Sequence, residues 1–134
     1  MNSLKINPKE EKRKIIQFIK YTLENESFQN VVIGASGGID STTSLYLLKE
    51  ATSTKNIFIA HLFYFEPDSS LPTILKESAI LPENFYNLSI KSIVDKLAKT
   101  LGVQPLKDSI RLGNIMARVR MILLYDLAKK HQAL

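Results

Sequence analysis

The segment from residue 31 to residue 43 constrains the fold of this chain more than any other segment. A short β-branched run, Val31–Ile33, enters a turn rich in Ser and Gly, and Ser41–Glu50 follows with Leu at helical spacing. Ile57–Phe63 is a second apolar run of the kind that forms buried strands. The residues between the two runs suffice for a right-handed crossover, so the segment predicts a βαβ unit with two buried, parallel strands.

The rest of the sequence repeats this alternation of helix and strand. The expected further elements are helices over 8–28, about 70–79, 89–101 and about 114–131, a strand over 85–88, and an irregular connection over 102–113. Asn7 and Pro8 suit the start of the first helix. We therefore expect an α/β fold, a Rossmann-like parallel sheet with helices on both faces, in a single domain over residues 1–134.

The composition excludes several classes of protein. The 134 residues carry a net charge of +5, are 45% hydrophobic and include no Cys. This apolar content can form a core, and the lack of Cys excludes disulfides, thiolate nucleophiles and Cys-ligated metals. The sequence shows neither a run of about 18 apolar residues nor a secretory leader, so we expect a cytoplasmic protein without a membrane span. The positive charge permits anionic ligands, but the basic run Lys12–Lys14 suits a solvated helix face, which argues against a nucleic-acid partner.

The turn after the first strand has the chemistry of a phosphate cradle. Gly37 and Gly38 let backbone N–H groups approach an anion without interference from a Cβ atom. Ser and Thr hydroxyls flank them, and the following helix adds free N–H groups and the positive end of its dipole. The candidate ATP-binding residues are Gly34, Ala35, Ser36, Gly37, Gly38, Ile39, Asp40 and Ser41.

Asp40 stands beside the expected phosphates, where two anions would repel each other. A Mg²⁺ ion between them resolves the conflict, so Asp40 is the candidate metal ligand. The alternative interpretation is a plain Gly-Gly turn followed by an acidic first helical turn. The position between a buried strand and a helix favours the phosphate site, because ligands in open α/β sheets bind at the carboxyl ends of the strands.

The spacing of the turn distinguishes it from other phosphate-binding motifs. No Lys follows Gly38 as a Walker motif requires, and the pattern Gly-x-Gly-x-x-Gly is absent from the sequence. The run Ser36–Ser41 instead resembles the Ser-Gly-Gly-x-Asp-Ser pyrophosphate loop of the ATP pyrophosphatase superfamily. That resemblance implies an enzyme that splits ATP into AMP and pyrophosphate to activate a carbonyl or carboxylate as an adenylate.

A second informative segment, Arg111–Asp126, lies in the last predicted helix. Asn114 and Arg118 are one turn apart and can reach one ligand, whereas Arg120 is about 200° away around the helix. The helix is apolar almost all round, as expected for a helix that contacts both the core and another subunit. The segment resembles the Lys/Arg-x-Gly-Asn-x-x-Ala-Arg-x-Arg-Met-x-x-Leu-Tyr-Asp signature of ammonia-dependent NAD⁺ synthetases.

This second resemblance, which extends along essentially the whole chain, implies a specific reaction. Deamido-NAD⁺, ATP and ammonia would give NAD⁺, AMP and pyrophosphate, with Mg²⁺ on Asp40 and deamido-NAD⁺ on Arg118 and Asn114. It also implies a homodimer with substrate sites at the subunit interface. The lack of Cys agrees with free ammonia as the nitrogen donor, because glutamine-using versions need a nucleophilic Cys. No catalytic residue is assigned.

The sequence departs from that family in two places. Glu66–Pro67 stands where the family has an apolar residue before Pro, and the family's Gly-Thr-x-Asn-Lys/Arg-x-Glu segment does not occur in the printed residues. We therefore expect the N-terminal portion of a longer enzyme, truncated before its next strand. Two alternatives remain: another adenylating ATP pyrophosphatase, such as a tRNA-modifying enzyme, or a remnant that binds nucleotide without activity.

Other chemically capable residues have simpler interpretations. His61 suits a satisfied core position, and His131 suits a partner of the helix dipole. Asp95 and Asp108 are expected at the surface. Core packing explains Phe63–Phe65 better than stacking on an adenine ring does.

Overall fold

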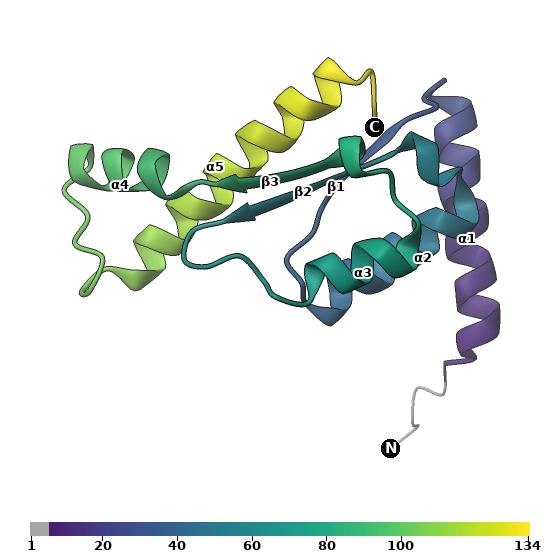
Figure 1. Cartoon of the computed structure of the whole chain (residues 1–134), viewed down its shortest axis with the longest axis horizontal. Coiled ribbons are helices and arrows are strands. Elements are labelled where there is room, and N and C mark those ends of the chain that lie inside the picture. The colour runs from purple at the N-terminus through teal and green to yellow at the C-terminus, as the bar shows by residue number, and fades with distance from the viewer. Residues whose placement is uncertain (1–5) are drawn as a thin grey trace.

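A computed structural model describes residues 6–134 as a parallel three-stranded sheet with helices packed around it (Figure 1). The strands are β1 (Val31–Gly34), β2 (Ile57–Phe63) and β3 (Phe85–Ser89), in the order β1-β2-β3. Both strand pairs are parallel, with Val31 opposite Ile57. The predicted α/β class is therefore confirmed, and β2 covers the residues expected from its apolar run. Residues 1–5 lie outside the described residues. They include the first residues of the expected domain and of the N-terminal segment in which we expect no secretory leader.

Helices cover both faces of the sheet, as expected. They are α1 (Pro8–Asn25), α2 (Ile39–Ala51), α3 (Leu71–Ser78), α4 (Lys91–Thr100) and α5 (Ser109–Lys130), with 3-10 turns at Thr54–Asn56 and Pro82–Asn84. Ile57 and Ile59 of β2 are fully buried against α2 and α3 on one face. Ala60 and Leu62 pack with α4 and α5 on the other. The central strand thus faces two apolar clusters, which fixes its register, because a one-residue slip would exchange its two faces.

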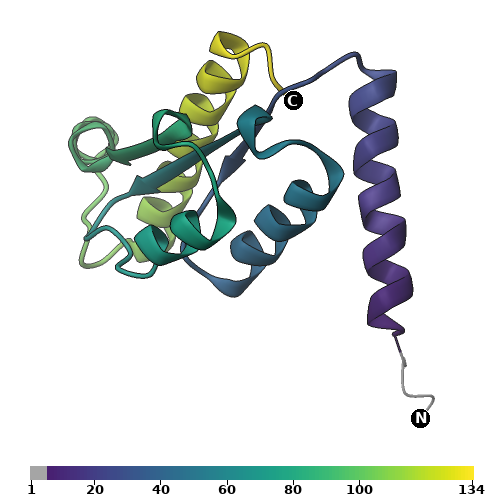
Figure 2. The same cartoon turned by 45° about the vertical axis from the view of Figure 1, so that its right-hand side comes forward.

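The first helix lies outside this sandwich and packs on α2 (Figure 2). Asn7 caps it as expected, since its side chain accepts a hydrogen bond from the N–H of Glu10 at 3.5 Å. The helix ends at Asn25, three residues earlier than predicted. Ser27 adopts a left-handed conformation with φ of 58°, and the N–H of Phe28 turns back to the carbonyl of Leu23. That reversal closes the helix.

The expectation that β1 is fully buried is only partly correct. Val31 is buried, but the next two residues are half-buried and Gly34 is exposed. β2 pairs along one edge of β1. On the other edge, within residues 6–134, β1 meets only the last residues of the chain, through a parallel bridge between Asn30 and Ala133 and a bond from the Val32 N–H to the Leu134 carbonyl.

The last helix begins at Ser109, five residues before its predicted start. Gly113 suggested a break, but it lies inside α5, where a Gly costs only about 1 kcal/mol. Four buried residues (Leu112, Ile115, Val119 and Leu127) stabilise the helix against the sheet. No helix among residues 6–134 is long and apolar enough to cross a membrane.

His131 ends α5 and differs from its expected role. Its ring stacks on Phe58 with centroids 3.8 Å apart, and its Nε2 lies 2.6 Å from the hydroxyl of Tyr86. Burial is the main cause that lowers the pKa of this imidazole, and the nearby charge of Lys130 adds to it. A lowered pKa favours the neutral ring, so His131 acts by packing rather than as a cation at the helix end.

Candidate functional site

The loop between β1 and α2 presents free backbone donors at the edge of the sheet. The N–H of Ala35 makes the last bond to β2, to the carbonyl of Ala60 at 2.9 Å, and the chain then leaves the sheet. Helix α2 begins at Ile39 with Gly38 as its N-cap, which has no side chain to cap the N–H groups that follow it. The hydroxyl of Ser36 accepts a hydrogen bond from the N–H of Gly38 itself at 3.2 Å. The first N–H groups of α2 therefore have no partner within the helix, and they carry its positive dipole end.

Hydroxyl groups gather at the mouth of this loop. The side-chain oxygens of Ser36 and Ser41 lie 3.1 Å apart, and Ser41 also donates to the carbonyl of Gly38 at 3.0 Å. The hydroxyl of Thr42 donates to the same carbonyl at 2.9 Å. The structure thus brings the predicted residues Gly34–Ser41 into one turn, in which the hydroxyls of Ser41 and Thr42 bond to the loop itself. The N–H groups at the start of α2 are the donors suited to binding phosphate.

The backbone conformation at residue 37 favours Gly, and a neighbouring side chain lies close against this residue. Its φ of 83° lies in the left-handed region, which side chains disfavour. A Cβ atom at Gly37 would also lie 2.3 Å from Cγ of Asp68. The carboxyl group of Asp68 therefore fills the space that a side chain at residue 37 would need.

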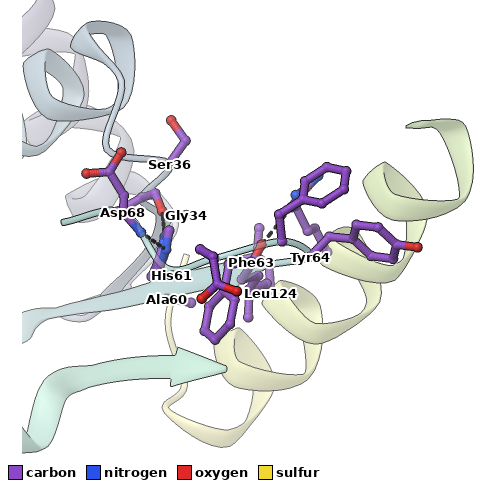
Figure 3. A pocket seen from close by; sticks show the side chains of 13 residues that line it. Gly34, Ser36, Ala60, His61, Phe63, Tyr64, Asp68 and Leu124 are labelled. Atoms are coloured by element: carbon purple, nitrogen blue, oxygen red, sulfur yellow. Dashed lines mark hydrogen bonds between the residues drawn. The ribbon is translucent and has the colours of Figure 1, made fainter. Parts of the chain in front are cut away.

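A pocket of about 540 Å³ opens at the carboxyl ends of β1 and β2 (Figure 3). Its volume lies within the range of small-molecule sites. Its lining residues are Gly34, Ala35, Ser36, Ala60, His61, Leu62, Phe63, Tyr64, Phe65, Glu66, Asp68, Arg120 and Leu124. The pocket thus joins the phosphate loop to an apolar wall, which is the location expected for a ligand in an open α/β sheet.

The aromatic residues at the end of β2 and just after it, Phe63–Phe65, do not behave alike. Tyr64 is buried in the core cluster, as predicted, whereas Phe65 is 75% exposed and the prediction of core packing is wrong for it. The Tyr64 hydroxyl donates to Asp95 at 2.6 Å, and this bond is the main cause that raises the pKa of Tyr64. Lys91 bonds the other carboxylate oxygen of Asp95 and is the main cause that lowers its pKa. Asp95 is therefore more than the surface residue expected, since it holds a wall residue of the pocket.

His61 is buried at the end of β2 and both of its ring nitrogens have partners. Nδ1 lies 2.8 Å from the carbonyl of Ala35, and Nε2 accepts a hydrogen bond from the N–H of Asp68 at 3.1 Å. The expectation of a satisfied core histidine is confirmed. The sequence did not indicate that both partners belong to segments that line the candidate site.

The Arg-rich motif of α5 divides between two faces of the helix. Asn114 and Arg118 are exposed on the same face, where Arg118 donates to the carbonyl of Asn114 at 3.2 Å, and neither lines the pocket. Arg120 points the other way, lines the pocket, and donates from Nε to the carbonyl of Leu62 at 2.9 Å. The pocket is therefore lined by Arg120, which lies about 200° around the helix from Arg118, and not by Arg118 itself.

The described residues place two carboxylates at the phosphate loop, those of Asp40 and Asp68. Asp40 is exposed in the first turn of α2. Among residues 6–134 there is no group of three or more His, Cys, Asp or Glu side chains placed to hold a metal. A Mg²⁺ ion held through one or two carboxylates together with phosphate oxygens and water fits such a site, because that is how nucleotide-bound magnesium is usually coordinated.

Comparison with known proteins identifies the family. The model for NAD synthase matches residues 11–134. This chain belongs to the NAD synthase family. The NH₃-dependent NAD⁺ synthetase of Fusobacterium nucleatum is 33% identical over 138 residues, which cover 100% of this chain and 51% of that protein. The enzyme of the same name from Thermococcus kodakarensis is 42% identical over 112 residues, or 83% of this chain and 42% of that protein.

Solved structures of an NAD synthetase and of an NMN synthetase agree with the fold. The NH₃-dependent NAD synthetase of Campylobacter jejuni, in complex with a nitrate ion, superimposes with a TM-score of 0.82 at 27% identity, over 96% of this chain and 55% of that one. The NMN synthetase of Francisella tularensis gives a TM-score of 0.78 at 25% identity, over 96% and 53%. The predicted resemblance is thus confirmed, and the chain spans about half the length of the curated relatives that it matches.

Proposed function

We propose that this chain carries the ATP-binding part of an enzyme that joins ammonia to deamido-NAD⁺. The reaction gives NAD⁺, AMP and pyrophosphate. The observation that supports it most strongly is the loop at Ser36–Ser41, which presents hydroxyls and an uncapped helix end beside a pocket at the carboxyl ends of β1 and β2. Membership of the NAD synthase family supports this reaction over the other reactions of adenylating enzymes.

The proposed reaction has two steps, adenylation of the carboxylate and formation of the amide. A carboxylate oxygen of deamido-NAD⁺ attacks the α-phosphorus of ATP, and pyrophosphate leaves with the electrons of the broken P–O bond. The nitrogen of ammonia then attacks the acyl carbon of the adenylate, AMP leaves with the electrons of the broken C–O bond, and the nitrogen releases a proton to solvent as the amide forms. The N–H groups at the start of α2 and the hydroxyls of Ser36 and Ser41 bind and orient the pyrophosphate portion and stabilise the charge that develops on it.

The remaining contacts divide among three parts of the chain. Mg²⁺ held by Asp40 would neutralise phosphate charge. The pocket wall beyond the loop, which includes Phe63 and Tyr64, offers an apolar surface for the nucleoside. On α5, the exposed pair Asn114 and Arg118 would bind deamido-NAD⁺, because the amide and guanidinium groups share one face.

We also propose that α5 carries the interface of a homodimer. Large apolar side chains on its outer surface are exposed in the single chain, among them Ile110 at 82%, Ile122 at 61% and Tyr125 at 70%. Several large apolar side chains exposed along one helix are typical of an interaction site. Light scattering tests the proposal, with Ile122→Glu expected to give monomers and Ile39→Glu, at an exposed residue of α2, serving as the control.

Turnover tests the proposed reaction directly. The chain is incubated with ATP, MgCl₂, deamido-NAD⁺ and ammonium chloride, and NAD⁺ is measured by an enzymatic cycling assay. We expect NAD⁺ to form only when ammonium and ATP are both present, and Asp40→Asn to reduce its rate. Nicotinate mononucleotide is tested as a second acceptor because an NMN synthetase shares the fold.

The alternatives give different results in the same experiment. A tRNA-modifying enzyme would release AMP only when RNA is added and would form no NAD⁺. A remnant would bind ATP, measured by calorimetry, without turnover. If the chain neither forms NAD⁺ nor binds ATP, the proposed function is wrong. A single cooperative unfolding transition of the same sample would support the expected single domain over residues 1–134.

A further inference from the structure

The carboxyl group of Asp68 lies on the phosphate loop, at a place where an anion is unexpected. Its three carboxyl atoms are 2.3–2.8 Å from the position that a Cβ atom would take on Gly37. One of its oxygens, Oδ1, accepts bonds from the N–H and the hydroxyl of Ser70, and these bonds keep the pKa of Asp68 below its usual value. The group is therefore a charged carboxylate in contact with the loop that we propose binds phosphate.

A hydrogen-bonded histidine holds the Asp68 backbone in this place (Figure 3). The carbonyl of Ala35 can only accept a hydrogen bond, so Nδ1 of His61 must carry the proton. The N–H of Asp68 can only donate, so Nε2 must be free of a proton. The two partners therefore select one neutral tautomer of His61, and that ring joins the loop after β1 to the segment after β2.

We propose that His61 is a positioning residue that latches Asp68 onto Gly37, and that Asp68 must be displaced when the loop binds the pyrophosphate portion of a nucleotide. The inference rests on the proposed function, because it concerns access to that same site. The carboxylate keeps the empty loop closed against small competing anions. A metal-bound triphosphate displaces it because the metal offsets the repulsion between the two anions.

Binding of inorganic pyrophosphate to the full chain tests the latch. Affinity is measured by calorimetry in EDTA and again with MgCl₂, for the unmodified chain and for Asp68→Asn. The Asn side chain has nearly the same shape and can still accept from Ser70, but it carries no charge. We expect Asp68→Asn to bind pyrophosphate about fivefold more tightly in EDTA, the effect of one contacting unit charge at a wet surface. The gain should shrink when Mg²⁺ is present.

Two further variants separate the latch from general effects of charge. Glu83→Gln is the matched control, since Glu83 is an exposed carboxylate in the 3-10 turn Pro82–Asn84 and does not line the pocket. It should change the affinity less than twofold. His61→Asn keeps a donor for the carbonyl of Ala35 but loses the acceptor for the N–H of Asp68. It should tighten binding in the same direction as Asp68→Asn, and the double variant should bind no more tightly than Asp68→Asn alone.

Nitrogen NMR of the His61 ring supplies a readout that a purely structural histidine would not change. The unliganded chain should show a protonated Nδ1 and an unprotonated Nε2. Added pyrophosphate should shift the Nε2 resonance and the Asp68 amide together, because their bond breaks. Resonances that stay unchanged at saturation would overturn the latch. Circular dichroism confirms that each variant is folded.

The outcomes separate this inference from the proposed function. If the unmodified chain binds pyrophosphate but Asp68→Asn does not tighten binding in EDTA, the latch is wrong and the phosphate site stands. If Asp68→Asn instead loses affinity only with Mg²⁺, Asp68 is a metal ligand, and the latch is again overturned. If neither pyrophosphate nor ATP binds to any variant, the phosphate site itself is wrong.

Discussion

Arg120 connects the last helix to the candidate site through one hydrogen bond. The last backbone hydrogen bond on this side of β2 runs from the N–H of Ala35, just after β1, to the carbonyl of Ala60. β2 continues beyond that point, whereas the chain that follows β1 turns away from the sheet. The carbonyl of Leu62, two residues further along β2, therefore lacks the strand partner that would have paired with it. The Nε–H of Arg120 donates to that carbonyl at 2.9 Å, so the side chain substitutes for a missing strand residue.

The variant Arg120→Met removes this donor and keeps a flexible stem of similar bulk. A hydrogen bond from a charged donor contributes about 1.5–3 kcal/mol, and its loss leaves a partly buried carbonyl unsatisfied. For a domain of this size, each 1 kcal/mol lowers the midpoint of thermal unfolding by about 4 °C. We therefore expect the midpoint to fall by about 6–12 °C.

Arg118→Met is the matched control in the same helix and motif. Arg118 is exposed and, among residues 6–134, bonds only to a carbonyl of its own helix, so its loss should change stability by less than about 0.5 kcal/mol. Unfolding is followed by far-ultraviolet circular dichroism on heating and in urea. Equal destabilisation by the two variants, or no destabilisation by Arg120→Met, would refute the argument that Arg120 completes the sheet. Arg118→Met should instead weaken binding of deamido-NAD⁺.

Three further predictions concern the core, the loop and pH. Ile59→Ala, at a residue with no exposed surface, should lower the free energy of unfolding in urea by about 2–5 kcal/mol. Gly37→Ala should weaken pyrophosphate binding measured by calorimetry, because residue 37 has a left-handed backbone with φ of 83°, which an Ala side chain disfavours. Stability should also fall as the pH drops below 6.5, since burial lowers the pKa of His131 and the unfolded chain binds the proton more readily. His131→Gln should show a smaller shift of its urea midpoint between pH 7.5 and pH 5.0 than the unmodified chain does, while an equal shift would assign the pH dependence to other groups.

Elements with a strong local pattern were predicted well. β2 has the predicted bounds, because a run of apolar residues buried on both faces leaves little choice of conformation. The predicted start of α5 is wrong. It took Gly113 to belong to an irregular segment, but a Gly inside a helix costs only about 1 kcal/mol. Four buried side chains on the same helix outweigh it. Which side chains of α5 become buried depends on how the helix packs on the assembled sheet, so the local sequence alone does not predict it.

The candidate site shows the same division between local and tertiary information. The phosphate loop could be recognised because strand, turn and helix residues adjoin in the sequence. Arg120 and His61 could not be assigned, because their partners depend on how far β2 extends beyond β1. Arg120 bonds a residue 58 positions away, and the helical wheel separates it from Arg118 without indicating which face meets the pocket. The distance by which β2 extends beyond β1 decides which face of α5 meets the pocket. The roles of Arg120 and His61 can therefore be assigned only from the three-dimensional arrangement of the two strands.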